Sequence, residues 1–280
     1  MRQVHWHIFL VAVLCAATWA RSSSARAYHT DKIRLLDSTA YSLPRRDVRV
    51  GLMKISYGII DQLQISTYTM PWLLGLILEE VAPNLELKST FYDRRRLALS
   101  ASFGFVEGAY QDALTKTEVR YLLFIAKLAS SVRLNSRLRV HIGGQYTGTD
   151  FVGDSEPADT DLRGAAVVYL LQLWGMFEWR LSRVVALTLT LRWVPWASDV
   201  LVRGEVAIDP NTGATVGINV EFVDLTNAYA IIPGFVFSWK RANIRVGVGY
   251  GNFFIEGFGL VAPASALHNI SPEFDVFVRF

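Results

Sequence analysis

The chain has 280 residues, of which 51% are hydrophobic, and carries 28 basic and 25 acidic side chains. Three of the basic residues and none of the acidic ones lie in residues 1–27, so the rest is neutral and gives no reason to expect nucleic-acid binding. Such an apolar chain, with no helix-length apolar run after residue 27, is either a soluble protein or a closed membrane β-barrel. In lipid, only helices and closed barrels satisfy every backbone group.

Residues 1–27 have the pattern of a cleaved export signal. Arg2 precedes the apolar run "IFLVAVLCAA" (8–17), and small-residue cleavage sites end at Ala20 and Ala27. The run is shorter than the roughly 20 apolar residues that cross a bilayer, which disfavours an anchor. Cleavage leaves residues 28–280 as a single domain and removes Cys15, the only cysteine, as suits an oxidising compartment.

Apolar and polar residues then alternate with a period of two, which is typical of β-strands. The alternating stretches, in chain order, are "NLELKSTFY" (84–92), "LALSASFGF" (97–105), "LRVHIGGQY" (138–146), "VVALTLTLRW" (184–193), "FVFSW" (235–239) and "IRVGVGYG" (244–251). Each has one apolar face and one small or polar face. Aromatic residues at the strand ends, such as Trp193, Trp239, Tyr146 and Tyr250, match the interface girdles of membrane barrels.

Short and long connections alternate along the chain, as periplasmic turns and extracellular loops do. The expected short turns are 58–61, 93–96, 134–137, 181–183 and 240–243, and the long loops are near 72–83, 108–116, 148–162, 197–227 and 257–271. With one strand over 48–57 and another from "LDSTAYSL" (36–43), the count is twelve. The hairpin around "DPNTG" (209–213) would make fourteen, and we interpret it as an extension above the membrane.

The stretch "PWLLGLIL" (71–78) is apolar although it falls in an expected loop. It either dips into the outer leaflet, folds into the barrel mouth, or extends the neighbouring strand. We expect the strand extension.

The C-terminal stretch "EFDVFVRF" (273–280) resembles the assembly signal of Gram-negative outer-membrane β-barrel proteins of the porin-like kind. In it, Phe274, Val276, Val278 and the terminal Phe280 alternate with Glu273, Asp275, Phe277 and Arg279. "STAYSLPRRDVRVG" and "YGIIDQLQIST" more loosely resemble the first strands of such barrels. The resemblance implies an outer-membrane location, contact with outer-membrane lipid and lipopolysaccharide, recognition by the barrel assembly machinery, and closure of the last strand against the first.

No enzyme is expected, and no cofactor or metal. His141 lies on a polar strand face with no serine or aspartate at a recognisable spacing, so we interpret it as a hydrogen-bonded interior residue. Alternation predicts that nine residues line the lumen: Glu86, Lys88, Arg139, Gln145, Glu178, Arg192, Arg245, Asp275 and Arg279.

Three functions remain open on the sequence. A polar, small-residue lumen favours a passive porin-like channel for small solutes. The 197–227 excursion favours a closed barrel with a structural or loop-mediated binding role. A soluble exported β-sandwich also has alternating strands, but its strands are shorter than those expected here.

Overall fold

The computed structural model describes residues 38–77, 83–94, 96–111, 118–155, 162–198, 200–209, 214–222, 226–239, 242–251 and 270–280. The expected export signal and most of the expected loop at 257–271 lie outside these residues.

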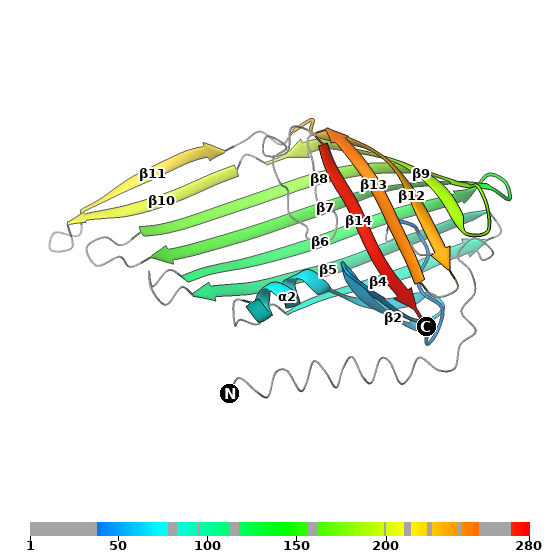
Figure 1. The fold of residues 1–280 in the computed structure, drawn as a ribbon. Coiled ribbons are helices and arrows are strands. Elements are labelled where there is room, and N and C mark those ends of the chain that lie inside the picture. Colours follow the sequence, from blue (N-terminus) through cyan, green and yellow to red (C-terminus); the bar gives the residue numbers. More distant parts are fainter. Residues whose placement is uncertain are drawn as a thin grey trace.

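Twelve strands close into one antiparallel barrel, seen from the side in Figure 1. In chain order they are β1 (Val48–Gly51), β2 (Lys54–Ile60), β3 (Leu63–Tyr68), β4 (Asn84–Arg94), β5 (Leu97–Gln111), β6 (Glu118–Arg133), β7 (Leu138–Ser155), β8 (Leu162–Arg180), β9 (Val185–Ala197), β12 (Tyr229–Trp239), β13 (Ala242–Gly251) and β14 (Ile270–Arg279). Sequential strands pair, β9 pairs with β12, and β14 closes against β1. The expected all-β, antiparallel up-and-down barrel of twelve strands is confirmed.

The expected hairpin is present as β10 (Val200–Asp209) and β11 (Ala214–Phe222). Strand β10 pairs with the first part of β8, from Leu162 to Val167, while the rest of β8 pairs with β9. The sheet therefore has fourteen strands, but the barrel closes through twelve. In Figure 1 the hairpin projects from one end of the barrel wall.

The outer face of the barrel is apolar, as a lipid-facing wall must be. Side chains such as Leu128, Phe103 and Ile142 are more than half exposed. The four aromatic residues expected at strand ends are all exposed. Trp239 and Tyr250 do lie at the ends of β12 and β13, but Trp193 is four residues before the end of β9 and Tyr146 is in the middle of β7. Tyr146 also stacks on Tyr169 of the next strand, with 6.2 Å between the ring centroids.

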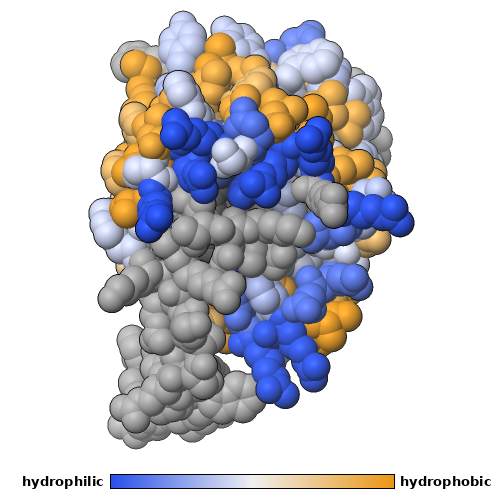
Figure 2. Space-filling view, turned by 90° about the vertical axis from the view of Figure 1, so that its right-hand side faces the viewer, coloured by the Kyte–Doolittle hydropathy of each residue, from blue (hydrophilic) through white to orange (hydrophobic). Residues whose placement is uncertain are grey.

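The five expected short turns all join strands at one end of the barrel. Figure 2 looks at this end and shows hydrophilic residues gathered over the turns, with hydrophobic ones around them. Exposed basic residues contribute to it, including Arg45, Arg94, Arg137 and Arg183. At the same end, Phe280 and Val48 exchange two backbone hydrogen bonds of 2.9 and 3.2 Å, which join the end of the chain to the start of β1.

The strand count is right, but the assignment of the first two strands is wrong. The expected strand 48–57 is two strands, because the chain reverses at residues 52 and 53 and lets β1 pair with both β2 and β14. This reversal is a short turn at the long-loop end, so the expected strict alternation of short and long connections is also wrong. "LDSTAYSL" is not a strand either, since its described residues 38–43 are irregular and buried.

The stretch after β3 is helical, so the expected strand extension is wrong there. Helix α2 (Thr69–Ile77) begins directly after β3 and has Pro71 in its first turn, where a missing backbone N–H costs nothing. The indole of Trp72 donates a 2.6 Å hydrogen bond to Thr67 Oγ1 of β3, which ties the helix to the strand. In the described part of the chain, no helix has the length and apolarity to cross a membrane.

Candidate functional site

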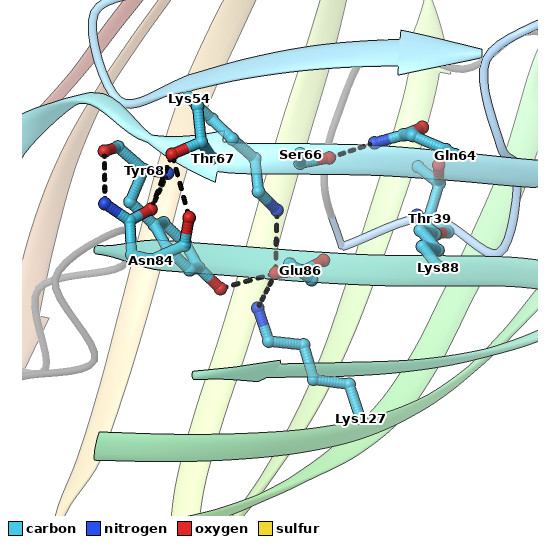
Figure 3. Close-up of polar contacts among 10 residues, drawn as sticks. All are labelled: Thr39, Lys54, Gln64, Ser66, Thr67, Tyr68, Asn84, Glu86, Lys88 and Lys127. Atoms are coloured by element: carbon cyan, nitrogen blue, oxygen red, sulfur yellow. Dashed lines mark hydrogen bonds and ion pairs between the residues drawn. The ribbon is translucent and has the colours of Figure 1, made fainter. Parts of the chain in front are cut away.

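The interior of the barrel holds charged side chains that pair across the lumen. The first cluster is centred on Glu86 of β4, which is 2% exposed. Lys54 Nζ of β2 lies 2.9 Å from Glu86 Oε2, and Lys127 Nζ of β6 lies 3.7 Å from the same oxygen. The Tyr68 hydroxyl donates to that oxygen as well. In Figure 3 the two lysines reach Glu86 from opposite sides, so this carboxylate links three strands.

A second cluster joins β9, β13, β14 and β1. Glu273 forms ion pairs with two arginines: Arg192 Nη2 lies 2.8 Å from Oε1 and Arg245 Nη2 lies 3.0 Å from Oε2. Asp275 accepts Arg49 at 2.8 Å, and the Arg49 guanidinium lies 4.2 Å from the centroid of the Phe277 ring. Since Arg192 and Glu273 come from strands separated by two others, the cluster ties β9 to β14 inside the barrel.

A third cluster surrounds His141 of β7, whose side chain is fully buried. Its Nδ1 lies 2.7 Å from Ser131 Oγ and its Nε2 lies 3.3 Å from Glu178 Oε2. Arg139 Nη1 is 3.8 Å from the other oxygen of Glu178. The ring of His141 therefore joins Ser131 of β6 to Glu178 of β8.

Residues 38–44, the luminal segment, enter the barrel from the short-turn end. Residues 38–43 are at most 9% exposed and are hydrogen-bonded to side chains of β3, β4, β6 and β8. Tyr41 packs with Ala40 against Ala98 of β5. Buried backbone groups must find partners, and the lumen wall supplies them here.

The luminal segment and the wall together fill this part of the barrel. Phe277 of β14 packs with Met176, Ala186 and Val236 from three other strands, and all four are fully buried. The Ser38 hydroxyl contacts the Met176 sulfur at 3.8 Å, so the segment and this apolar cluster are continuous.

Toward the long-loop end the inner face is more apolar. Tyr68, Val106, Leu123 and Ile125 form one buried cluster there. Leu170, Val194 and Ala228 form another. Toward the long-loop end the lumen expected to be polar is therefore mixed, since the apolar residues around Tyr68 lie beside the Glu86 cluster.

The structure places the nine sequence-predicted lining residues in the barrel wall and brings seven into ion pairs with other interior groups. Of the other two, Lys88 donates a hydrogen bond of 2.6 Å to the Thr39 carbonyl, and half-buried Gln145 donates one of 2.8 Å to Thr147 Oγ1. Arg279 pairs with Asp47 near the closure of the sheet. The interior residues that sequence reasoning missed include Arg49, Lys54, Tyr68, Lys127, Ser131 and Glu273.

His141 has the serine and carboxylate partners that sequence spacing did not reveal. The Ser131 hydroxyl also accepts the Ala40 N–H at 2.8 Å, and the group is buried under the luminal segment. The three residues therefore link β6, β7 and β8 to the luminal segment. Within the described residues, no group of three His, Cys, Asp or Glu side chains has metal-binding geometry.

Comparison with solved structures gives only low overall similarities. The fold is similar to that of a TodX monoaromatic hydrocarbon channel mutant, at 9% identity and a TM-score of 0.44, over 86% of this chain and 68% of that one. It is also similar to CdiB from Acinetobacter baumannii, at 11% identity and a TM-score of 0.32, over 85% of this chain and 60% of that one. A Rh. blastica porin mutant aligns at 12% identity and a TM-score of 0.16, over 84% and 97%.

No family model and no curated protein sequence matches the chain. All three TM-scores lie below 0.5, so these matches describe similar barrels and say nothing of this chain's solute or partners.

Proposed function

We propose that this protein is an outer-membrane channel for small solutes, of the porin-like kind, which the luminal segment holds closed. The observation that carries the proposal is the segment itself, which is irregular, buried, and bonded to wall side chains rather than built into the sheet. A segment outside the sheet can leave the lumen without breaking a strand pairing.

The charged groups of the interior support passage of anions in the open state. The ion pairs described above, together with Lys88, comprise eight basic and five acidic side chains. Charged side chains lining a pore set its ion selectivity. An excess of three positive charges favours anionic solutes once the lumen is open.

The outer-membrane location is part of this proposal. It is supported by the apolar, aromatic-rimmed outer wall and by the C-terminal alternation of Phe274, Val276, Val278 and Phe280. Phe274 is 49% exposed on the outer face, while Asp275 and Phe277 face inward. The proposed partners are outer-membrane lipid, lipopolysaccharide and the barrel assembly machinery, reached after cleavage of residues 1–27.

Single-channel recording in planar bilayers tests the channel proposal. The intact chain is expected to be closed with brief openings, and a variant lacking residues 38–44 is expected to stay open for long periods. Absence of conductance above the bilayer background in both proteins would exclude a channel.

A closed barrel with a structural or binding role is the second candidate, and the buried ion pairs favour it. Lys54, Glu86 and Arg192 are at most 5% exposed, and the ion pairs that they form tie nearby strands of the barrel wall together. If the deletion variant folds as a barrel but does not conduct, this second function is the correct one.

A further inference from the structure

The wall around the luminal segment binds a peptide backbone. Five backbone groups of the segment receive a hydrogen bond from, or donate one to, a side chain of the wall. Three carbonyls of the segment accept hydrogen bonds: that of Ser38 from Trp174 Nε1 at 3.3 Å, that of Thr39 from Lys88 Nζ at 2.6 Å, and that of Ala40 from Thr90 Oγ1 at 2.8 Å. Two N–H groups donate: that of Ala40 to Ser131 Oγ at 2.8 Å, and that of Leu43 to Gln64 Oε1 at 3.0 Å.

These wall groups come from β3, β4, β6 and β8, and other residues hold two of them in place. The Trp174 ring lies against Gly143, where an added Cβ would come within 2.2 Å of Cζ2, so only glycine leaves room for it. His141 bonds Ser131 and is itself bonded to Glu178. Groups fixed in this way lose little freedom on binding, which favours affinity.

The resident segment has small side chains at most of its positions, and the bonds above reach its main chain. Ser38, Thr39, Ala40 and Ser42 fill little volume beside the backbone. A site that recognises main-chain groups tolerates different sequences, provided that their side chains are small enough to fit.

We propose that this part of the lumen is a binding site for short oligopeptides of small residues, with the luminal segment as its resident, tethered ligand. When the segment withdraws, a free peptide takes the same five bonds. This inference deepens the proposed channel function and rests on it for the route by which a peptide arrives, but binding itself is measurable without a membrane.

Fluorescence anisotropy of labelled peptides with the purified protein in detergent tests the site. The probes are the peptide STAYSLP, which copies residues 38–44, and a seven-residue peptide of serine and alanine only. The variant lacking 38–44 is expected to bind both, with dissociation constants within about tenfold of each other, and at least tenfold more tightly than the intact chain. Failure to bind either peptide overturns the site, and binding of STAYSLP alone overturns the class of ligand.

A matched pair of variants distinguishes recognition of the peptide backbone from non-specific peptide binding. In the deletion variant, Ser131→Ala removes the acceptor for the peptide N–H and is expected to weaken binding about fivefold, since one buried hydrogen bond is worth about 1 kcal/mol. Ser130→Ala, on the neighbouring outward-facing position of β6, is expected to leave affinity unchanged. Equal effects of the two substitutions overturn the proposed contacts.

If the deletion variant does not fold, the intact chain still gives a test. With Cys15 replaced by serine and Ser38 by cysteine, millimolar STAYSLP is expected to raise the rate of maleimide labelling at position 38, because it displaces the tethered segment. A labelling rate unaffected by peptide overturns the proposal. Because none of these measurements uses conductance, failure of the peptide site and failure of the channel are distinguishable.

Discussion

The luminal segment leaves the barrel in close contact with Gly58 of β2. This contact makes the closed state sensitive to a single methyl group added at Gly58. A Cβ at Gly58 would lie 1.9 Å from the Pro44 carbonyl oxygen and 2.9 Å from that of Leu43. Real Cβ contacts essentially never fall below 3.0 Å, so Gly58→Ala forces backbone atoms to retreat by more than 1 Å. Glycine is the residue that permits such a close approach of two backbones.

The expected magnitude follows from the bonds that this movement breaks. Pro44 accepts from the Asp47 N–H at 3.1 Å, and Leu43 donates to Gln64 at 3.0 Å. At about 1 kcal/mol for each bond, the closed position loses about 2 kcal/mol. Because 1.36 kcal/mol corresponds to a factor of ten, the fraction of molecules with the segment out of the lumen rises about thirtyfold.

Cysteine labelling measures this fraction. In a chain with Cys15→Ser and Ser38→Cys, position 38 is buried, so the labelling rate reports how often the segment leaves the lumen. Gly58→Ala is expected to raise that rate about thirtyfold. Gly175→Ala is the matched control, because a Cβ at Gly175 meets nothing within 4 Å. An unchanged rate with Gly58→Ala, or the same increase with Gly175→Ala, would refute the reasoning.

Four further predictions follow from the interior and the C-terminus. Lys88→Met removes the charged donor to the Thr39 carbonyl and is expected to raise labelling at position 38 tenfold or more, since such a bond is worth about 1.5–3 kcal/mol; an unchanged rate contradicts this. Glu86→Gln leaves two lysines without their carboxylate and is expected to cost about 3 kcal/mol in urea unfolding, whereas Glu107→Gln, at an exposed position, is expected to cost little. Reversal potentials in a salt gradient are expected to show anion preference in the variant lacking residues 38–44, and cation preference would contradict the charge count. Deletion of Phe280 is expected to reduce membrane assembly more than export. Assembly is measured as the amount of heat-modifiable, folded barrel and export as the total amount of exported protein. Normal assembly of the truncated chain would count against a role of Phe280 as an assembly signal.

The long strands could be predicted because their alternation is local. In β9, Leu187, Leu189 and Leu191 face outward while Thr188 and Thr190 are buried, as a period of two requires. The inward positions of Glu86 and Arg192 follow from the same parity. Glu273 lies two residues before Asp275, so the same alternation also predicts that it faces inward.

The first part of the barrel could not be predicted in the same way. The reversal at residues 52 and 53 changes the parity, so Arg49 and Lys54 face the same lumen although a single continuous strand would place them on opposite faces. Lys127 lies in a largely apolar stretch of β6, where alternation is weak. The luminal segment has partners as distant in sequence as Lys88, Ser131 and Trp174, and only closure of the barrel brings these residues together.

Conductance under redox control tests the central claim most directly. In a Cys15→Ser background, Ser38→Cys and Met176→Cys place two thiols where the native side chains approach to 3.8 Å, so that oxidation ties the luminal segment to β8. We predict that the oxidised protein gives no openings in a planar bilayer and that reductant restores the brief openings of the parent chain. Equal conductance before and after reduction, with the disulfide verified by mass spectrometry, would contradict closure by this segment.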